Sequence, residues 1–153
     1  MREIRKIVVH CSATREGLYY SRNDIDDWHR KRGMNGCGYH YIVLLDGTIQ
    51  CGRMECQVGA HVIGHNVDSI GICYIGGLDR QGNPKDTRTE AQKKALRQLI
   101  SKVAARYPKA KVYGHRDLSP DKNNDGVITK DEWLKECPCF DAVEEYKDLC
   151  CDN

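Results

Sequence analysis

The chain has 153 residues, enough for one domain with a hydrophobic core, and its 24 basic and 22 acidic side chains give a formal net charge of +2. This nearly balanced charge lacks the excess of basic residues that is typical of nucleic-acid-binding proteins. No apolar run is long enough to form a membrane-spanning helix. The charged N-terminal residues do not form a signal peptide, so we expect a cytoplasmic monomer whose nine cysteines are reduced.

The first expected elements are a strand and a helix. Residues 4–9 are apolar and rich in β-branched side chains, which predicts a buried central strand. Residues 22–32 predict a helix, because Ser21 and Asp24 supply an N-terminal cap and Gly33 ends the pattern.

The remaining elements continue this alternation of strands and helices. A hairpin around Asp46-Gly47 is expected over residues 39–51, and a buried strand over 69–75. A helix capped by Thr89 follows over residues 90–107, and a short last strand over 111–113. The pattern predicts the α/β class: a single domain over residues 1–153, with a mixed central sheet flanked by helices.

Two histidines each follow an apolar strand, His10 after the first strand and His115 after the last. Further along, Cys137 and Cys139 flank Pro138. Two imidazoles and one thiolate make a three-ligand Zn²⁺ site whose fourth position stays open, which is the catalytic arrangement. The two thiols are too close in sequence to be independent ligands, so we expect one ligand and one bystander. Each residue taken alone also fits a structural role.

Residues 121–132 match the EF-hand calcium loop in full. The expected Ca²⁺ ligands are Asp121, Asn123, Asp125, the carbonyl of Val127, and Glu132. A second interpretation stays open, because Thr129 and Glu132 also form a capping box that would begin a helix carrying Trp133 and Lys135.

Several long motifs occur in order along the chain: IVVHCSAT, GCGYHYIVLLDGTIQCGR, VGAHVIGHNVDSIGICYIGG, GHRDLSPD and KECPCFD. With these motifs the chain resembles the N-acetylmuramoyl-L-alanine amidases of the phage-lysozyme type, a family that includes the peptidoglycan recognition proteins. The resemblance extends from about Lys6 to about Val143 and implies the amidase fold.

The resemblance also implies roles for single residues. It makes His10, His115 and Cys137 the zinc ligands and places Tyr39 and Lys135 at the two catalytic positions. His61 falls in a glycine-rich loop at the rim of the substrate groove, where it contacts substrate or supports the metal ligands. Because shorter members of the family lack the acidic insertion, the position of Lys135 depends on how that insertion folds.

The pattern also predicts the environment of other side chains. We expect His40 to be buried on the sheet face opposite Tyr39, and His29 to be exposed on its helix. Cys11, Cys51 and Cys73 are expected to act as small apolar core residues.

We therefore expect zinc-dependent hydrolysis of the amide bond between N-acetylmuramic acid and L-alanine in peptidoglycan or muropeptides. One alternative is a module of the same fold that binds muropeptide without cutting it; such binders lack the cysteine ligand. A structural zinc or calcium protein would instead have a closed four-ligand site including Cys139 or Asp141. The setting that fits best is a phage or prophage endolysin released by a holin-like partner, while a recycling enzyme and an exported toxin stay open.

Overall fold

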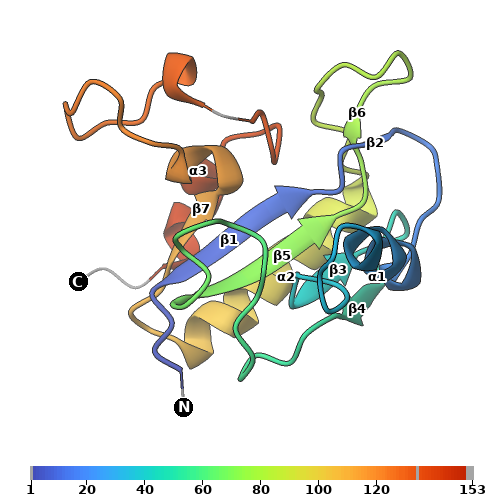
Figure 1. Ribbon diagram of the computed structural model, residues 1–153, viewed down its shortest axis with the longest axis horizontal. Coiled ribbons are helices and arrows are strands. Elements are labelled where there is room, and N and C mark those ends of the chain that lie inside the picture. Colours follow the sequence, from blue (N-terminus) through green and yellow to red (C-terminus); the bar gives the residue numbers. More distant parts are fainter. Residues whose placement is uncertain (1, 134, 151–153) are drawn as a thin grey trace.

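A five-stranded sheet forms the centre of the molecule in the computed structural model, which describes residues 2–133 and 135–150 (Figure 1). Its strands are β1 (Lys6–Cys11), β3 (Tyr41–Val43), β4 (Ile49–Cys51), β5 (Ser69–Tyr74) and β7 (Lys111–Gly114), in the order β4-β3-β5-β1-β7. β3 and β4 are antiparallel, and the other neighbouring pairs are parallel. The expected α/β class with a mixed sheet is confirmed.

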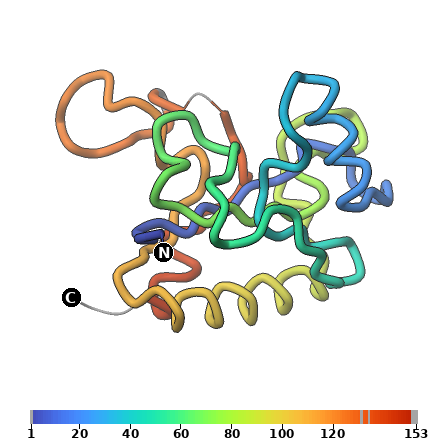
Figure 2. Tube along the Cα trace, turned by 60° about the horizontal axis from the view of Figure 1, so that its bottom comes forward, coloured from blue at the N-terminus to red at the C-terminus, as the bar shows by residue number. Residues whose placement is uncertain are grey.

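The two faces of the sheet have different coverings. The long helix α2 (Glu90–Arg106) packs on one face, where it shares a hydrophobic cluster with Ile7 and Val9 of β1 (Figure 2). The shorter helix α1 (Arg22–Lys31) and the longer loops lie on the other face, with Ile42 and Cys73 beneath them. Because side chains alternate along a strand, His10 points away from α2 and toward the loops.

Local capping explains where the two main helices begin. The backbone N–H of Ser21 donates to the Asp24 carboxylate at 2.8 Å at the start of α1. The hydroxyl of Thr89 accepts from the N–H of Gln92 at 3.0 Å at the start of α2. Both starts agree with the sequence, and both helices end one residue earlier than expected. No helix of the described residues is long and apolar enough to cross a membrane.

Smaller elements complete the chain. A second sheet pairs β2 (Thr14–Arg15) with β6 (Gly77–Leu78). The C-terminal part contains the short 3₁₀ helices η1 (His115–Leu118), η2 (Lys130–Glu132) and η3 (Lys147–Leu149) and the helix α3 (Ala142–Tyr146). The cysteines among the described residues are all free thiols, and Cys151 lies outside those residues.

Two expectations about local structure are wrong. Tyr39 does not lie on a strand, because β3 begins only at Tyr41. The capping box of Thr129 and Glu132 starts a single 3₁₀ turn rather than a helix carrying Lys135, since the backbone is already extended at Trp133.

Two expectations about burial are also wrong. His29 is only 7% exposed, because its Nδ1 accepts the backbone N–H of Gly38 at 2.9 Å and the ring lies inside the fold. Cys51 is exposed, since β4 is an edge strand. His40, in contrast, is fully buried as expected.

Candidate functional site

Three side chains of the kinds that can bind a metal come from distant parts of the chain and meet at one end of the sheet. His10 lies near the end of β1, and His115 follows β7 directly. β1 and β7 are parallel neighbours with Val9 opposite Gly114, so the two histidines are brought together by strand pairing. With Cys137 they form a group whose ligand atoms all lie within 4.8 Å of one another.

Backbone contacts hold Cys137 in this group. The N–H of Cys11 points at the Sγ of Cys137 at 3.1 Å, and the N–H of Arg116 donates to the Cys137 carbonyl at 2.9 Å. Cys139 turns the other way, and its thiol donates to the carbonyl of Gly77 at 3.3 Å. The structure therefore brings Cys137, and not Cys139, to the histidines.

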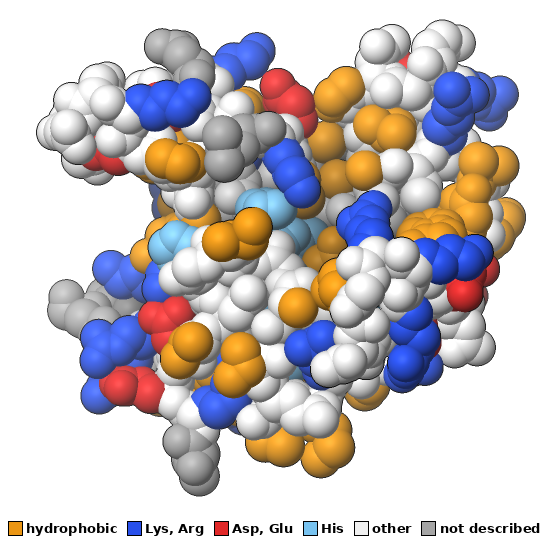
Figure 3. Space-filling model, viewed as in Figure 1, with side chains coloured by type: hydrophobic (Ala, Val, Ile, Leu, Met, Phe, Trp, Pro, Cys, Tyr) orange, Lys and Arg blue, Asp and Glu red, His pale blue; other side chains and the backbone are white. Residues whose placement is uncertain are grey.

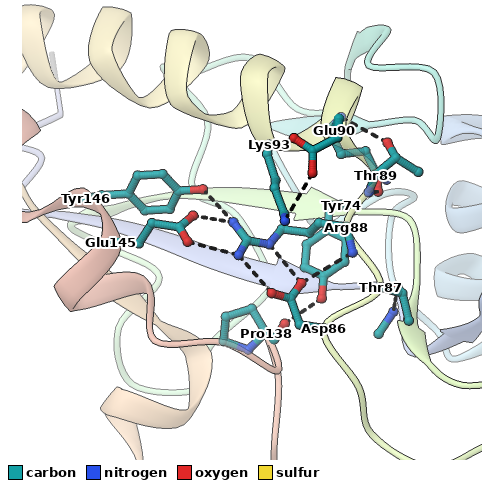
Figure 4. Close-up of polar contacts among 12 residues, drawn as sticks. Tyr74, Asp86, Thr87, Arg88, Thr89, Glu90, Lys93, Pro138, Glu145 and Tyr146 are labelled. Atoms are coloured by element: carbon teal, nitrogen blue, oxygen red, sulfur yellow. Dashed lines mark hydrogen bonds and ion pairs between the residues drawn. The ribbon is translucent and has the colours of Figure 1, made fainter.

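A buried arginine anchors the segment that follows the cysteine (Figure 4). The Arg88 side chain is 2% exposed, forms an ion pair with Glu145 and lies 3.4 Å from the centroid of the Phe140 ring. The hydroxyl of Tyr74 donates to the carbonyl of Pro138 at 2.6 Å. A buried charge must be paired, so Arg88 and its partners fix this segment against α2 and the sheet.

The donor set and its spacing fit Zn²⁺. Zn–N distances of about 2.0–2.1 Å and Zn–S distances of about 2.3 Å place tetrahedral ligand atoms roughly 3.3–3.7 Å apart. The separations of up to 4.8 Å among His10, His115 and Cys137 need only small inward shifts. Asp141 does not join them, because its carboxylate caps α3 by accepting from the N–H of Glu144. The group is thus a three-ligand set among the described residues.

The electrostatic environment keeps the histidines neutral. Burial lowers the pKa of His10 well below its usual value. Burial, and then the positive charge of Lys135, lower the pKa of His115 to about 4. Burial also lowers the pKa of His61 to about 3. A neutral imidazole is the form that binds a metal, so this environment favours ligation at neutral pH.

Two further aromatic side chains border His10. Nδ1 of His61 lies 2.9 Å from Nε2 of His10, and a Cβ at Gly71 would come within 2.7 Å of the His61 ring. The lack of a side chain at Gly71 therefore leaves the space that the His61 imidazole occupies. The ring centroid of Tyr39 lies 5.0 Å from that of His10. Burial raises the pKa of Tyr39 well above its usual value, so its hydroxyl stays protonated.

A cavity of about 400 Å³ opens beside these histidines. Figure 3 shows histidine side chains in a hollow near the middle of this face, with hydrophobic and basic side chains around it. Its wall is formed largely by apolar side chains, including Met34, Val62 and Leu118, while His115 and Lys135 contribute polar groups. An apolar cleft with a few convergent polar groups is typical of a small-molecule or substrate site.

The acidic loop brings its carboxylates together as well. Asp121, Asp125 and Glu132 lie with oxygens within 4.8 Å of one another. The N–H of Gly126 donates to one Asp121 oxygen at 2.8 Å, and the other oxygen of this carboxylate is buried without a partner among the described residues. Glu132 accepts from the N–H of Thr129 at 3.1 Å. The carboxylate cluster and the capping box therefore coexist.

The other two residues of the expected calcium loop lie at the surface. Asn123 is exposed, and its side-chain oxygen accepts from the N–H of Asp125 at 3.2 Å. Val127 is 59% exposed. Both residues lie in the same loop as the three clustered carboxylates.

Two residues that support the site were not among the predicted site residues. The side-chain oxygen of Asn66 accepts the N–H groups of His61 and Val62, both at 2.9 Å. His29 packs against Tyr39, with ring centroids 5.4 Å apart. Helical spacing carried a signal for His29, because it lies four residues after the buried Ile25 on the same helix face.

Sequence comparison places the chain among known families. A family model described as N-acetylmuramoyl-L-alanine amidase matches residues 1–128, which include His10 and His115 but end before Lys135 and Cys137. The chain is 38% identical over 139 residues to an endolysin of Klebsiella phage KP32, covering 91% of this chain and 83% of the relative.

Solved structures share the same fold. An N-acetylmuramoyl-L-alanine amidase, LysC from Clostridium intestinale, matches with a TM-score of 0.73 and 26% identity, covering 99% of this chain and 88% of that one. Drosophila PGRP-LB matches with a TM-score of 0.70 and 24% identity, covering 96% and 81%, which shows likeness of fold alone.

Proposed function

Because this chain belongs to the N-acetylmuramoyl-L-alanine amidase family, we propose that it is a zinc-dependent peptidoglycan amidase. The bond cut would be the amide between N-acetylmuramic acid and L-alanine. The observation that carries the proposal is the meeting of His10, His115 and Cys137 beside a cavity of about 400 Å³.

Amide hydrolysis needs an activated water, charge stabilisation for the oxyanion and a proton for the leaving nitrogen. Zn²⁺ held by the three ligands would act as a Lewis acid on the carbonyl and lower the pKa of a water to roughly 7. The His₂Cys set would leave a net charge of about +1 on such a centre, which keeps it a competent Lewis acid.

Tyr39 and Lys135 are proposed to contribute the remaining chemistry. The Tyr39 hydroxyl is held in its protonated form, so it can donate a hydrogen bond to the attacking water or to the substrate carbonyl. Lys135 lines the cavity next to His115, where its ammonium can stabilise the negative charge that develops on the carbonyl oxygen.

His61 is proposed to orient His10. We assign His10 Nε2–H as donor to Nδ1 of His61, and His61 Nε2–H as donor to the hydroxyl of Ser69 at 3.2 Å. This leaves Nδ1 of His10 free for the metal. Metal-bound histidines usually donate their other ring N–H in this way, which fixes the tautomer and the ring plane. His61 also lines the cavity, so it can contact substrate.

Mass spectrometry of the products from purified peptidoglycan tests the proposal, because it reports activity and the position of the broken bond together. Release of free L-alanine amino termini with intact glycan strands is expected. Intact peptidoglycan despite tight binding would favour the non-catalytic binding module, and products cut at a sugar linkage would rule out an amidase.

The endolysin relatives suggest the biological setting. We propose a monomer that acts on peptidoglycan without binding nucleic acid or inserting into a membrane. A holin-like partner would release it from the cytoplasm to the cell wall. Cells that make this protein together with a holin should lyse, and cells that make this protein alone should not. This result would support the proposed setting.

We also propose that the acidic loop binds Ca²⁺. The full match to the EF-hand loop, the clustered carboxylates of Asp121, Asp125 and Glu132, and the unpartnered Asp121 oxygen support it. A bound ion would stiffen the loop that precedes Lys135 and Cys137.

A further inference from the structure

The loop of residues 52–68, between β4 and β5, contains no helix or strand, yet it builds one wall of the cavity. His61, Val62, Ile63 and Asn66 all lie on this wall. Of the larger apolar side chains in the loop, Val62 is buried, but Ile63 is 99% exposed and Val67 75%, so burial of apolar side chains accounts for little of the loop's shape. Something else must hold the loop in place.

Arg2, close to the start of the chain, makes the contacts that close this loop. Its guanidinium donates to backbone carbonyls at both ends of the loop and at the first residue of β5. The acceptors are Glu55 at 2.8 Å, Gln57 at 2.9 Å, Asn66 at 2.9 Å, Val67 at 3.2 Å and Ser69 at 2.9 Å.

The chemistry of this contact requires an arginine. Converging carbonyl oxygens repel one another unless a cation lies between them, and the planar guanidinium can donate in several directions within one plane. An ammonium at the same position would be a point charge with fewer donors, unable to reach both ends of the loop. Removing the guanidinium would leave the partly buried carbonyls without donors, which is costly.

A short chain of contacts connects Arg2 to the metal ligands. Arg2 binds the carbonyl of Asn66, whose side chain accepts the N–H groups of His61 and Val62. His61 in turn contacts His10 at 2.9 Å. We infer that Arg2 is a positioning residue that shapes the substrate cavity and holds His61 against the metal ligand, through the loop that it closes. The catalytic part of this inference rests on the proposed amidase function.

Amide hydrogen exchange followed by mass spectrometry tests the inference without substrate. In Arg2→Ala, exchange in the loop should rise by about ten- to hundredfold, the factor expected when charge-assisted hydrogen bonds are lost, while β1 and β5 stay protected. Millimolar guanidinium should restore protection, because it can occupy the vacated place between the carbonyls. Arg5→Ala is the matched control, since Arg5 is exposed and its side chain pairs with Glu3.

Kinetics with a soluble muropeptide give the second readout. Arg2→Ala and Arg2→Lys should raise KM at unchanged zinc content, and guanidinium should lower KM again in Arg2→Ala only. The inference would be overturned if amide exchange in the loop were unchanged in both variants. It would also be overturned if exchange rose uniformly over the whole fold and guanidinium did not reverse the rise. If Arg2→Ala does not fold, Arg2→Lys decides by the same exchange pattern. If the wild-type protein cuts no muropeptide, the amidase proposal fails, while the exchange experiment still decides the role of Arg2.

Discussion

Nε2 of His10 lies 2.9 Å from Nδ1 of His61, so a residue from an irregular loop buttresses a residue of the central strand. In the proposed zinc site, His61 would support His10 from outside the three-ligand group. His61→Ala should lower zinc affinity by about 10- to 100-fold, as is typical when the partner of a metal-bound histidine is lost. Zinc titration against a competing chelator measures this, with His65→Ala as control. His61→Asn should lose less zinc affinity than His61→Ala, because the side-chain oxygen of asparagine can replace Nδ1 of His61 as the hydrogen-bond acceptor. Equal zinc affinity in all variants would remove His61 from the metal centre.

Cys137→Ser should lose bound zinc and turnover together, because a serine hydroxyl is a poor replacement for a thiolate ligand. Cys139→Ser should keep most of both, since the Cys139 thiol faces the Gly77 carbonyl instead of the histidines. Elemental analysis and a dye-release assay on cell walls measure the two effects. The reverse pattern would mean that Cys139 is the ligand, and full activity in metal-free protein would refute the zinc proposal.

Tyr39→Phe removes only the hydroxyl beside the metal group. The ring contacts with His10 and His29 remain, so the fold and the zinc content should not change. The turnover number should fall by about 10²–10⁴-fold, the usual size of an acid–base or positioning contribution. Wild-type turnover in this variant would reduce Tyr39 to an aromatic packing residue.

The metal-free protein should lose stability as the pH falls below 6.5. Burial lowers the pKa of His61 to about 3 and that of His115 to about 4, from an ordinary value of 6.5. Between these values the unfolded chain binds protons that the folded chain does not, so protons favour unfolding. The free energy of unfolding should therefore decrease from pH 6.5 downward and stop responding to these groups below about pH 3. Urea unfolding in chelator at pH 7.5, 6.5 and 5.5 measures the onset, above the range where carboxylates titrate. A flat profile between pH 6.5 and 5.5 would contradict the buried, neutral state of these histidines.

Calcium should raise the melting temperature of the protein if the acidic loop binds it, because a ligand that binds only the folded state stabilises it by mass action. Asp125→Asn should reduce this rise while leaving the calcium-free melting temperature unchanged, since the amide oxygen can still accept the N–H of Val127. Asp27→Asn, an exposed change in α1, is the control. Glu132→Gln is less selective, because both oxygens of Glu132 accept backbone N–H groups. If calcium does not change the melting temperature of the wild-type protein, the calcium proposal is wrong and Glu132 has only its capping role.

Much of the fold could be predicted from the sequence, because short-range contacts decide it. The caps at Ser21 and Thr89 and the Asp46-Gly47 turn act over a few residues, and each element begins or turns where expected. The alternation along β1 likewise determines which side chains share a face. The boundaries moved where non-local contacts prevailed, as at Tyr39, whose carbonyl accepts from Arg53 outside the strand.

The site depended on contacts that no local pattern carries. His10 and His115 meet only because β1 pairs with β7, and Cys137 joins them through the backbone of Cys11. The sequence alone left Cys137 and Cys139 equivalent until the family resemblance selected one, whereas the fold separates them by direction. Arg2 carried no signal at all, because a charged side chain near the start of a chain is ordinary until distant carbonyls converge on it. The sequence thus determined which chemical groups are available. Tertiary packing decided which of these groups come within bonding distance of one another.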